Sequence, residues 1–398
     1  MPEPTPFHPR TSELCQSLAW RHWAGYHAVS NYRDFLQPEY AAIRHSAALI
    51  DVSPLYKYRV EGPQAAAFLD RVITHHAAGA AVGQAIYTPW CDADGKVRQE
   101  GTVFRLAEDR FQVNAAEPAY GWLRHNAAGF DVELADDSTR YAALSLQGPH
   151  ARRILRDVTR GVDLDDLKFF RLSEGEIAGA RVLVSRTGYT GDLGYELWLE
   201  RDAALAVWDA LMAGGEPHHV RPCGLAAMDV ARVEAGFILV SVDYKSSEVA
   251  LVEADKSTPY ELGMGWAVKL GKGPFVGRRA LMEEKAKGSA WQLVGLEIGW
   301  EPLEKMFIEV GLMPDLPHVV NREPVPVYAG LTGPQVGQVT SRVWSSLLKR
   351  YVALASVETK FASPGTELTM EVTVRYSRRR APARVVKTPF FRPERMRA

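Results

Sequence analysis

The sequence predicts an α+β protein with a duplicated α+β N-terminal part and a C-terminal antiparallel β-barrel. Two observations carry this prediction. A strand–glycine–proline–helix pattern occurs twice in the first half of the chain. From about Trp291 onward, short strands alternate with turn residues and helical periodicity is nearly absent. At 398 residues the chain is also longer than a single hydrophobic core usually serves, which favours several domains.

Composition and charge place the chain among soluble globular proteins. Hydrophobic residues make up 46% and charged residues 24%, and 47 basic side chains oppose 48 acidic ones. This balance gives no electrostatic reason to expect nucleic acid or a membrane as a main partner, and no segment approaches the roughly 18 apolar residues of a membrane span. The three cysteines lie far apart, and the first ten residues contain no apolar signal segment, so we expect a cytoplasmic protein.

The two copies of the repeated pattern keep the same spacing. Val60–Val72 has the sequence V-E-G-P-Q-A-A-A-F-L-D-R-V, and Leu146–Val158 has the sequence L-Q-G-P-H-A-R-R-I-L-R-D-V. Each predicts a strand end, a Gly-Pro pair and a helix with proline in its first turn, where the missing N–H is tolerated. We interpret the pair as a duplicated half of the protein.

Other elements follow from hydrophobic periodicity and turn residues. We expect helices at Glu39–Ser46, Ala203–Ala213 and Gly224–Gly236. Strands are predicted at Ala48–Val52, Tyr56–Val60, Gln84–Tyr87, Thr102–Leu106, Arg110–Asn114, Phe169–Leu172 and Ala180–Val184. The barrel strands are predicted at Leu293–Ile298, Val325–Tyr328, Val336–Thr340, Val352–Ser356 and Leu368–Val374, after a linker at Lys285–Ser289.

Two charged patterns favour ordinary surface roles. The basic run Arg375–Arg380 resembles a nucleic-acid patch, but in a neutral chain a solvated edge strand and turn is the better interpretation. The adjacent histidine pairs at 75–76 and 218–219 lack the helical spacing of metal ligands, so no metal site is predicted.

The most distinctive segment is a glycine-rich turn between two strands. Val184–Leu199 has the sequence V-S-R-T-G-Y-T-G-D-L-G-Y-E-L-W-L, with a glycine at every third position from 188 to 194. Such spacing lets the backbone approach a ligand closely. The segment also presents Arg186, Tyr189, Asp192 and Glu196. A hairpin with a solvated rim remains the alternative for this window alone.

Together with other segments, this turn is similar to a known family. The motifs that carry the likeness are W-A-G-Y (23–26), D-V-S (51–53), A-I-Y (85–87), V-N-A-A (113–116), L-Q-G-P (146–149), S-R-T-G-Y-T-G (185–191), G-Y-E-L (194–197), R-P-C-G-L (221–225), R-V-E-A (232–235), W-A-V-K-L (266–270), F-V-G-R (275–278) and V-T-S (339–341). The chain resembles the folate-dependent aminomethyltransferase family, which includes the glycine cleavage T-protein and tetrahydrofolate-dependent demethylases.

The resemblance implies a three-domain cloverleaf with tetrahydrofolate in a central channel. Residues 1–285 would form the folate-binding region as two interleaved α+β domains, 1–50 with 140–285 and 51–139, and residues 290–398 would form the barrel. Glu196 falls on the glutamate that binds the pterin N3–H and 2-amino group, a bidentate geometry suited to a carboxylate. The other cofactor-binding residues implied are Tyr87, Tyr189, Asn114, Arg186 and Trp266. Without the resemblance, an outward Glu196 paired with an arginine and tyrosines packed in a core remain alternatives.

The chain departs from the family where chemistry is expected. In place of the family's G-G-I-x-D-D loop it has Gly95–Glu100, so Gln99 replaces the first aspartate and Glu100 the second. We expect Glu100, together with Tyr189, to be catalytic, with Glu100 steering a proton and offsetting developing positive charge. This depends on an ungapped register, because Asp92 or Asp94 would take the role if the loop were shifted.

Two further departures fall near the expected one-carbon donor. Met228-Asp229 replaces the family's Arg-Asp, which either leaves a carboxylate unpaired or makes the cavity more apolar, and Pro54-Leu55 replaces His-Met. The donor site would include Met228, Trp90 and Tyr26. We therefore favour transfer of a methyl or aminomethyl group from a small N-, O- or S-methylated donor to N5 of tetrahydrofolate.

Two alternatives remain for the function. One is a true T-protein aminomethyltransferase, whose partner would be a lipoylated carrier protein. The other is a non-enzymatic folate-binding protein, which is disfavoured because Arg221–Gly236 lacks the K-G-C-Y-x-G-Q-E segment of that branch.

Overall fold

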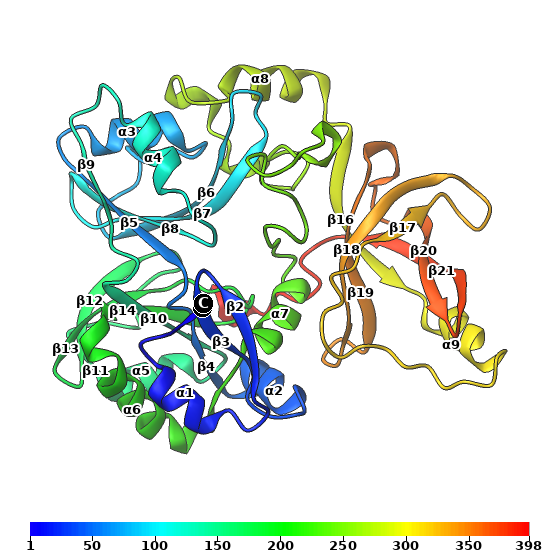
Figure 1. The fold of residues 1–398 in the computed structure, drawn as a ribbon, viewed down its shortest axis with the longest axis horizontal. Helices are drawn as coiled ribbons and strands as arrows, with labels where there is room; N and C mark the ends of the chain where they lie inside the picture. The colour runs from blue at the N-terminus through cyan, green and yellow to red at the C-terminus, as the bar shows by residue number, and fades with distance from the viewer. Residues whose placement is uncertain (398) are drawn as a thin grey trace. The chain divides into compact units, whose positions relative to one another are not determined.

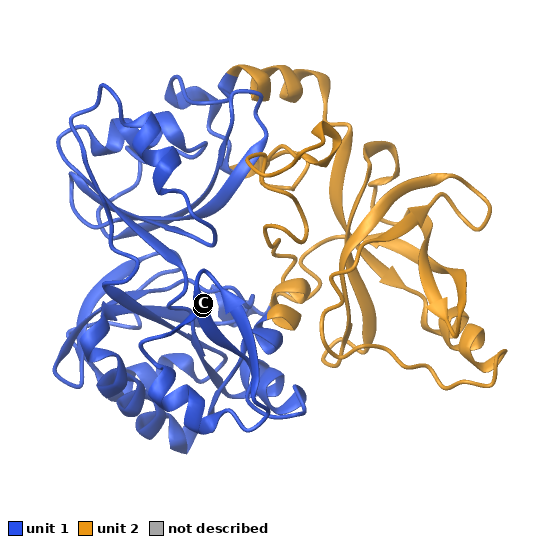
Figure 2. Cartoon of the chain, in the orientation of Figure 1, with its two compact units in different colours: residues 1–228, 267–278, 393–398 blue, residues 229–266, 279–392 orange. Residues whose placement is uncertain are grey.

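The computed structural model describes residues 1–397, which divide into two compact units (Figure 2). The first unit comprises residues 1–228, 267–278 and the segment from residue 393 onward, and the second comprises residues 229–266 and 279–392. Within the described part of the chain, no helix is both long enough and apolar enough to span a bilayer.

The first unit contains a five-stranded antiparallel sheet with strand order β6-β7-β8-β5-β9 (Figure 1). Its strands are β5 (Tyr56–Glu61), β6 (Gln84–Cys91), β7 (Val97–Arg105), β8 (Arg110–Ala115) and β9 (Glu133–Asp136). Helices α3 (Ala65–Val72) and α4 (Tyr120–Asn126) supply Phe68, Leu69 and Leu123 to a core that also includes Val103 and Phe111 of the strands. Because strand side chains alternate, the residues between these core positions point to the other face of the sheet.

A seven-stranded sheet with order β11-β12-β13-β14-β10-β4-β15 completes the larger part of this unit. Its strands are β4 (Ala47–Asp51), β10 (Tyr141–Gln147), β11 (Thr159–Arg160), β12 (Leu172–Ile177), β13 (Ala180–Ser185), β14 (Gly194–Glu200) and β15 (Val220–Pro222). Helices α5 (Ala151–Val158) and α6 (Ala204–Gly215) belong to its core, in which Ile154 and Trp208 join Leu144, Val184 and Leu197.

The N-terminal segment adds a small sheet of three strands with order β1-β3-β2. Its elements are β1 (Glu3–Pro4), α1 (His8–Leu14), β2 (Ala19–Trp23), β3 (Tyr26–Asn31) and α2 (Gln37–His45). Ala24 and Gly25, which join β2 to β3, both have positive φ, of 47° and 86°, as the tight turn of a right-twisted hairpin requires. Helix α2 confirms the helix expected at Glu39–Ser46.

The repeated strand–glycine–proline–helix pattern has the same backbone in both copies. Gly62 follows β5 with φ of 134°, and Gly148 follows β10 with φ of 126°. In each copy the glycine carbonyl accepts the N–H of the first helical residue, Ala65 or Ala151, at 3.0 Å. The duplication is therefore confirmed locally. The expectation that proline lies in the first helical turn is wrong. Pro63 and Pro149 each lie two residues before the first helical residue, in the turn that precedes the helix.

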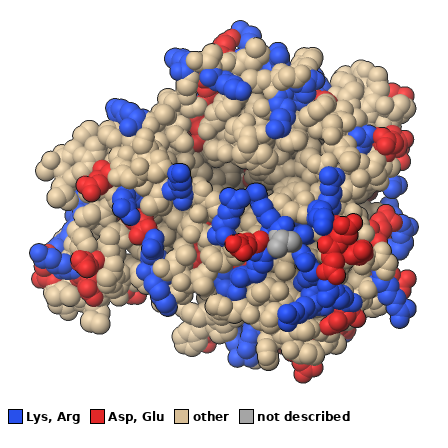
Figure 3. Space-filling model, turned by 180° about the vertical axis from the view of Figure 1, so that it is seen from behind, with Lys and Arg blue, Asp and Glu red and all other residues tan. Residues whose placement is uncertain are grey.

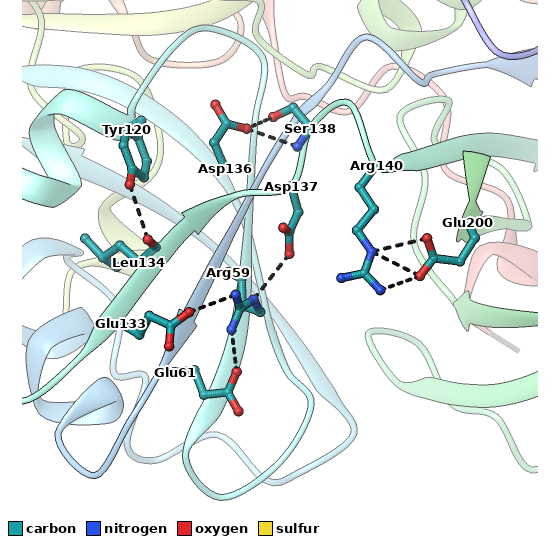
Figure 4. Close-up of polar contacts among 10 residues, drawn as sticks. All are labelled: Arg59, Glu61, Tyr120, Glu133, Leu134, Asp136, Asp137, Ser138, Arg140 and Glu200. Atoms are coloured by element: carbon teal, nitrogen blue, oxygen red, sulfur yellow. Dashed lines mark hydrogen bonds and ion pairs between the residues drawn. The ribbon is translucent and has the colours of Figure 1, made fainter. Parts of the chain in front are cut away.

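The chain passes from one large sheet to the other between β9 and β10 (Figure 4). Arg59 of β5 lies 3.4 Å from Asp137 and 3.0 Å from Glu133 of β9. Beyond this point, Arg140 forms an ion pair with Glu200 of β14 at 2.7 Å. Exposed pairs of this kind each contribute little stability. They link β5 to β9 and to Asp137 after it, and the start of β10 to β14.

The second unit is a closed six-stranded barrel with order β16-β19-β18-β17-β20-β21, and this confirms the predicted barrel. Its strands are β16 (Trp291–Ile298), β17 (Val325–Tyr328), β18 (Gln335–Ser345), β19 (Arg350–Glu358), β20 (Glu367–Val374) and β21 (Ser377–Val386). Helix α8 (Arg278–Lys287) occupies most of the expected linker. Helix α9 (Trp300–Ile308) contradicts the expected lack of helix, since Leu303 and Phe307 are buried against the barrel core. Helix α7 (Leu225–Glu234) begins at the end of the first unit and continues into the second.

The basic run Arg375–Arg380 lies in the turn between β20 and β21 and at the start of β21. Arg379 pairs with Glu309 at 2.7 Å, and Arg380 donates to the carbonyls of Leu331 and Gly333 while lying 3.6 Å from the Tyr328 ring centroid. These contacts agree with a strand edge whose cations have local partners. On the face drawn in Figure 3, basic and acidic side chains are interspersed.

Candidate active site

The glycine-rich turn between β13 and β14 is built around the side chain of Gln147. This side chain is fully buried, and its amide oxygen accepts the Thr190 hydroxyl at 2.7 Å. A Cβ atom at Gly188 would lie 2.3 Å from that oxygen, and one at Gly194 would lie 2.1 Å from it. The two glycines are therefore required because the glutamine fills the space that their side chains would occupy.

Glu196 lies at the exit of this turn, on the face of the sheet opposite the helices. It is paired across the sheet with Ser145 of β10 and with Ser185 of β13. Its Oε2 atom accepts the Thr187 hydroxyl at 2.5 Å, and that hydroxyl lies 2.6 Å from the Ser185 hydroxyl. Among residues 1–397, the other carboxylate oxygen of Glu196 has no hydrogen-bond partner. The carboxylate is thus anchored through one oxygen and open at the other.

The surroundings of Glu196 disfavour its charged form. Burial raises the pKa of this carboxyl above the ordinary glutamate value, and the Thr187 hydrogen bond opposes part of that rise. The side chain is nevertheless only partly buried, and its open oxygen retains contact with solvent. A carboxylate of this kind gains most from a ligand that brings N–H donors and restores the hydrogen bonds lost on leaving water.

A second polar row crosses the five-stranded sheet on its helix-free face. Tyr87 of β6 is paired with Thr102 of β7, and Thr102 is paired with Asn114 of β8. The Asn114 amide nitrogen donates to the Thr102 hydroxyl at 3.1 Å, and its amide oxygen accepts from Gln112 at 2.7 Å. Tyr87 is half-exposed, whereas Asn114 is buried and already bonded. Tyr87 is thus the more accessible of the two predicted residues.

These two faces belong to one unit and are connected through Phe170. The carbonyl of Phe170 accepts the N–H of Ala85 on β6, and its own N–H donates to the carbonyl of Arg186 at the start of the glycine-rich turn. The helix-free faces also touch directly, because the Phe104 and Trp198 rings meet edge to face with centroids 5.5 Å apart. Tyr87 and Glu196 therefore face the space where the two sheets meet.

The residues predicted to replace the family's aspartate pair lie in strand β7 rather than in a loop. Strand alternation separates them. Gln99 is paired with Trp90, is buried, and donates from its amide nitrogen to the carbonyl of Pro118 at 2.7 Å. Glu100 is half-buried and points to the opposite face, the face that carries Tyr87. Of the two positions, only Glu100 shares a face with the polar row.

The preceding loop 91–96 is a turn organised by Asp92. One oxygen of its carboxylate accepts the backbone N–H groups of Asp94 and Lys96, each at 3.0 Å. This is the Asx-type use of an aspartate, which stabilises a turn. Asp92 is therefore occupied with backbone hydrogen bonds, and Asp94 is exposed.

Lys57 is a buried cation next to Asn114 in the sheet. Its ammonium donates to the carbonyls of Ser53 at 2.7 Å, Leu55 at 2.6 Å and Ser138 at 3.5 Å. Burial lowers the pKa of Lys57 to about 7. Two of these carbonyls, those of Ser53 and Leu55, flank Pro54, where the sequence departs from the family.

The remaining predicted cofactor residues have different surroundings. Tyr189 is half-exposed at the tip of the glycine-rich turn. Arg186 is buried and donates to the carbonyl of Leu167 at 2.9 Å, so its guanidinium supports the turn from inside. Trp266 belongs to the second unit, where its side chain is 58% exposed.

The three predicted donor-site residues lie on different elements, and one of them, Trp90, points to the helical face of its sheet. Trp90 is 1% exposed and belongs to the core on the helical face of the five-stranded sheet, opposite Tyr87. Tyr26 is buried on β3, and Met228 is half-buried on α7. Trp90 is therefore a core residue of the five-stranded sheet.

Asp229 is not left unpaired by the absence of a neighbouring arginine. Its carboxylate lies 2.8 Å from Arg232 on one side and 2.7 Å from Arg322 on the other, all within the second unit. The expectation of an unpaired carboxylate is thus wrong. Arg322 supplies the cation from a position 93 residues along the chain, a relation that no local pattern reveals.

Several residues that shape the site were not predicted. Gln147 was seen only as part of the repeated L-Q-G-P motif, and Thr187 only as part of the turn sequence. The regular glycine spacing was the available signal for Gln147, because glycines next to a buried strand indicate a side chain that fills their space. Lys57 gave no signal, since an alternating strand normally places lysine in water.

Comparison with known proteins agrees with this geometry. Residues 10–272 match the family model described as the GCVT N-terminal domain, and residues 309–392 match that of the glycine cleavage T-protein C-terminal barrel domain. An aminomethyltransferase of Halothermothrix orenii is 36% identical over 89% of this chain and 90% of its own length, and one of Symbiobacterium thermophilum is 37% identical over 89% and 88%. The crystal structure of glycine cleavage system aminomethyltransferase T from Bartonella henselae superimposes with a TM-score of 0.81 at 25% identity, covering 98% of this chain and 99% of that one.

Proposed function

Because the chain belongs to the glycine cleavage T-protein family, we propose that it is an aminomethyltransferase that passes a one-carbon unit to tetrahydrofolate. The aminomethyl donor is carried on the lipoyl arm of a partner protein. This proposal replaces the small methylated donor favoured by the sequence, because the similar curated proteins are named aminomethyltransferase. It is supported by the site in the first unit.

The observation that carries the proposal is the open oxygen of Glu196. A pterin offers two parallel N–H donors, one for each oxygen of a carboxylate. The open oxygen of Glu196 can accept one of them, and Oε2, which keeps a second lone pair beside the Thr187 hydrogen bond, can accept the other. Tyr189 and Tyr87 offer half-exposed aromatic faces that suit a flat ring. Tetrahydrofolate, when bound, supplies the nitrogen nucleophile that receives the one-carbon unit. Glu196, Tyr189 and Tyr87 bind it and fix its orientation.

Glu100 is the residue we assign to proton handling. It is the half-buried carboxylate on the face that bears Tyr87, whereas Gln99 points into the core and carries no charge. As a carboxylate, Glu100 would offset positive charge that develops on N5 as it attacks the carbon, and would then accept the proton that N5 releases. Fixing both reactants against these side chains removes much of the entropic barrier.

The first experiment is calorimetric titration with tetrahydrofolate. We expect wild-type protein to bind and Glu196→Gln to lose about 10- to 100-fold in affinity, the effect of one charge-assisted hydrogen bond. Glu200→Gln is the matched control, because Glu200 lies on the same strand but pairs with Arg140 at the surface. Absence of binding to wild-type protein would overturn the folate proposal.

The donor is identified by a second assay with two arms. One arm supplies an aminomethylated lipoyl carrier protein, and the other a panel of small N-, O- and S-methylated compounds, each with tetrahydrofolate. Turnover confined to the carrier arm is expected. Turnover confined to the small donors would contradict the aminomethyltransferase proposal and favour a demethylase. The half-buried Met228 would then be a candidate for contact with the donor.

A further inference from the structure

The segment after residue 392 lies beyond both ranges that match the family models, yet it contacts the glycine-rich turn. Arg395 binds Asp192 of that turn through two parallel contacts, Nε to Oδ1 at 2.6 Å and Nη2 to Oδ2 at 2.9 Å. The Asp192 side chain has no exposed surface, whereas that of Arg395 is 38% exposed. This is a bidentate arginine–carboxylate pair across 203 residues of sequence.

Asp192 has a second cation that does not depend on this segment. Arg44, whose side chain is fully buried, lies 3.3 Å from Asp192 Oδ2 and donates to the carbonyl of Thr190 at 2.9 Å. The N–H of Leu193 also donates to Asp192 Oδ1, at 2.8 Å. Asp192 therefore keeps an ion pair and a backbone hydrogen bond without Arg395. Removal of Arg395 does not leave an isolated buried charge, so the folded state is expected to survive it.

The position of Asp192 decides what the pair with Arg395 can affect. Asp192 lies between Tyr189 and Glu196, next to Gly191, whose φ is 69°. On its other side, the carbonyl of Leu193 accepts the N–H of Gly148 at 2.7 Å. A force on the Asp192 carboxylate therefore acts on the short backbone segment that carries both predicted ligand contacts.

We propose that residues 393–397 form a C-terminal clasp in which Arg395, acting through Asp192, positions the glycine-rich turn for its ligand. Arg395 is a positioning residue and does not itself touch the ligand. A planar guanidinium restrains both carboxylate oxygens at once, which fixes the orientation of Asp192 as well as its charge. The identity of the ligand rests on the proposed function, but the restraint on the turn does not.

The test compares Arg395→Ala with Arg10→Ala. Arg10 also binds an aspartate, Asp209, through two parallel contacts of 2.8 and 2.9 Å, and its side chain is 36% exposed, but it joins α1 to α6. We expect faster amide hydrogen exchange at residues 187–194 in Arg395→Ala without ligand, and unchanged exchange there in Arg10→Ala. Equal exchange in both variants would overturn the clasp, whatever the ligand is.

A second readout uses tetrahydrofolate. We expect Arg395→Ala to weaken binding about 5- to 20-fold, Arg395→Lys to restore only part of this loss, and Arg10→Ala to leave binding unchanged. Full restoration by lysine would show that charge alone acts and would overturn the geometric role. If wild-type protein does not bind tetrahydrofolate, the proposed function fails, and the exchange measurement still decides the clasp.

Discussion

The two copies of the strand–glycine–proline–helix unit have the same backbone but differ in the residue before the glycine. In the first copy this residue is Glu61, which lies at the surface and pairs with Arg59 at 2.7 Å. In the second copy it is Gln147, which is fully buried and supports the glycine-rich turn. The comparison teaches that duplication supplied the scaffold, whereas the candidate site depends on side chains that only one copy presents inward.

The largest effect is expected from breaking the contact between Gln147 and its glycines. Gly194→Ala and Gln147→Ala should each lower the free energy of unfolding by about 2–3 kcal/mol, because each disrupts buried hydrogen bonds. In the double variant the alanine Cβ occupies space that Gln147 has left, so the two losses should not add, with a coupling of about 1–2 kcal/mol. Urea unfolding measures all three variants.

Strictly additive losses would contradict this steric relation between Gln147 and Gly194. Gly271→Ala is a useful reference, since Gly271, like Gly194, has no positive φ, and no atom lies within 4 Å of its Cβ position. The change in its free energy of unfolding reports a glycine-to-alanine replacement without a steric clash.

A second prediction concerns Glu196, which lies on β14, the strand next to β10 that leads into the second copy. Its folded-state pKa is raised, so the folded protein binds this proton more readily than the unfolded chain does. The ionised carboxyl therefore lowers stability at neutral pH, and the penalty disappears as the pH falls to that of an ordinary glutamate. Glu196→Gln should consequently be at least as stable as wild-type protein at pH 7 while it loses ligand affinity.

The same shift predicts the pH dependence of binding. Wild-type affinity for tetrahydrofolate should begin to fall on acidification at a higher pH than an unperturbed glutamate would cause, since ligand N–H donors require the ionised carboxylate. Calorimetry at several pH values measures this fall. A wild-type affinity that stays constant down to the ordinary glutamate range would contradict the assignment.

A third prediction concerns Lys57, which lies four residues before Glu61 in the first copy. The equivalent position in the second copy, four residues before Gln147, is Ala143. The pKa of Lys57 is lowered to about 7, so between this value and the ordinary lysine value the unfolded chain binds more protons. Stability should therefore rise with pH above 7 by roughly 1 kcal/mol per pH unit for this group.

The Lys57→Met variant removes that slope and keeps the volume of the side chain. When both proteins are measured at pH 7, 8 and 9, the free energy of unfolding of the wild type should rise relative to that of the variant at each step. Lys272, whose pKa is lowered to about 8 and which also binds three backbone carbonyls, stays unchanged in both proteins. A pH-independent difference would mean that Lys57 titrates normally.

The smallest effect is expected at Glu61. Glu61→Ala should change the free energy of unfolding by less than about 0.5 kcal/mol, because exposed ion pairs contribute little. It should leave tetrahydrofolate binding unaltered. A loss comparable to that of Gln147→Ala would erase the distinction between the two copies.

Local patterns predicted the α+β class and the C-terminal barrel. The Gly-Pro spacing revealed the repeat, and alternating apolar residues located β17 and most barrel strands. Helix α9 was missed because its nine residues, with a proline near the start, interrupt a strand-rich region and depend on packing against the barrel through Leu303 and Phe307. Placing Gln99 and Glu100 in a loop was wrong because β7 begins at Val97, immediately after the turn organised by Asp92.

The sequence predicted those parts of the candidate site whose residues lie close together along the chain. Glu196 and Tyr189 lie within one short segment, so their association follows from the sequence. Arg322 reaches Asp229 from 93 residues away, and Arg395 reaches Asp192 from 203 residues away. Such pairs form because the fold brings them together, and neither hydrophobic periodicity nor turn chemistry encodes them.

The interrupted course of the chain through the first unit has a consequence for its biogenesis. Residues 393–397 leave the ribosome only after the whole second unit has been synthesised, although their partner Asp192 emerged some 200 residues earlier. At about 5–20 residues per second, the nascent first unit waits on the order of 10 seconds or more for its last contacts. During that interval the glycine-rich turn has Arg44 and Gln147 among its partners but lacks Arg395, so it folds first without the clasp.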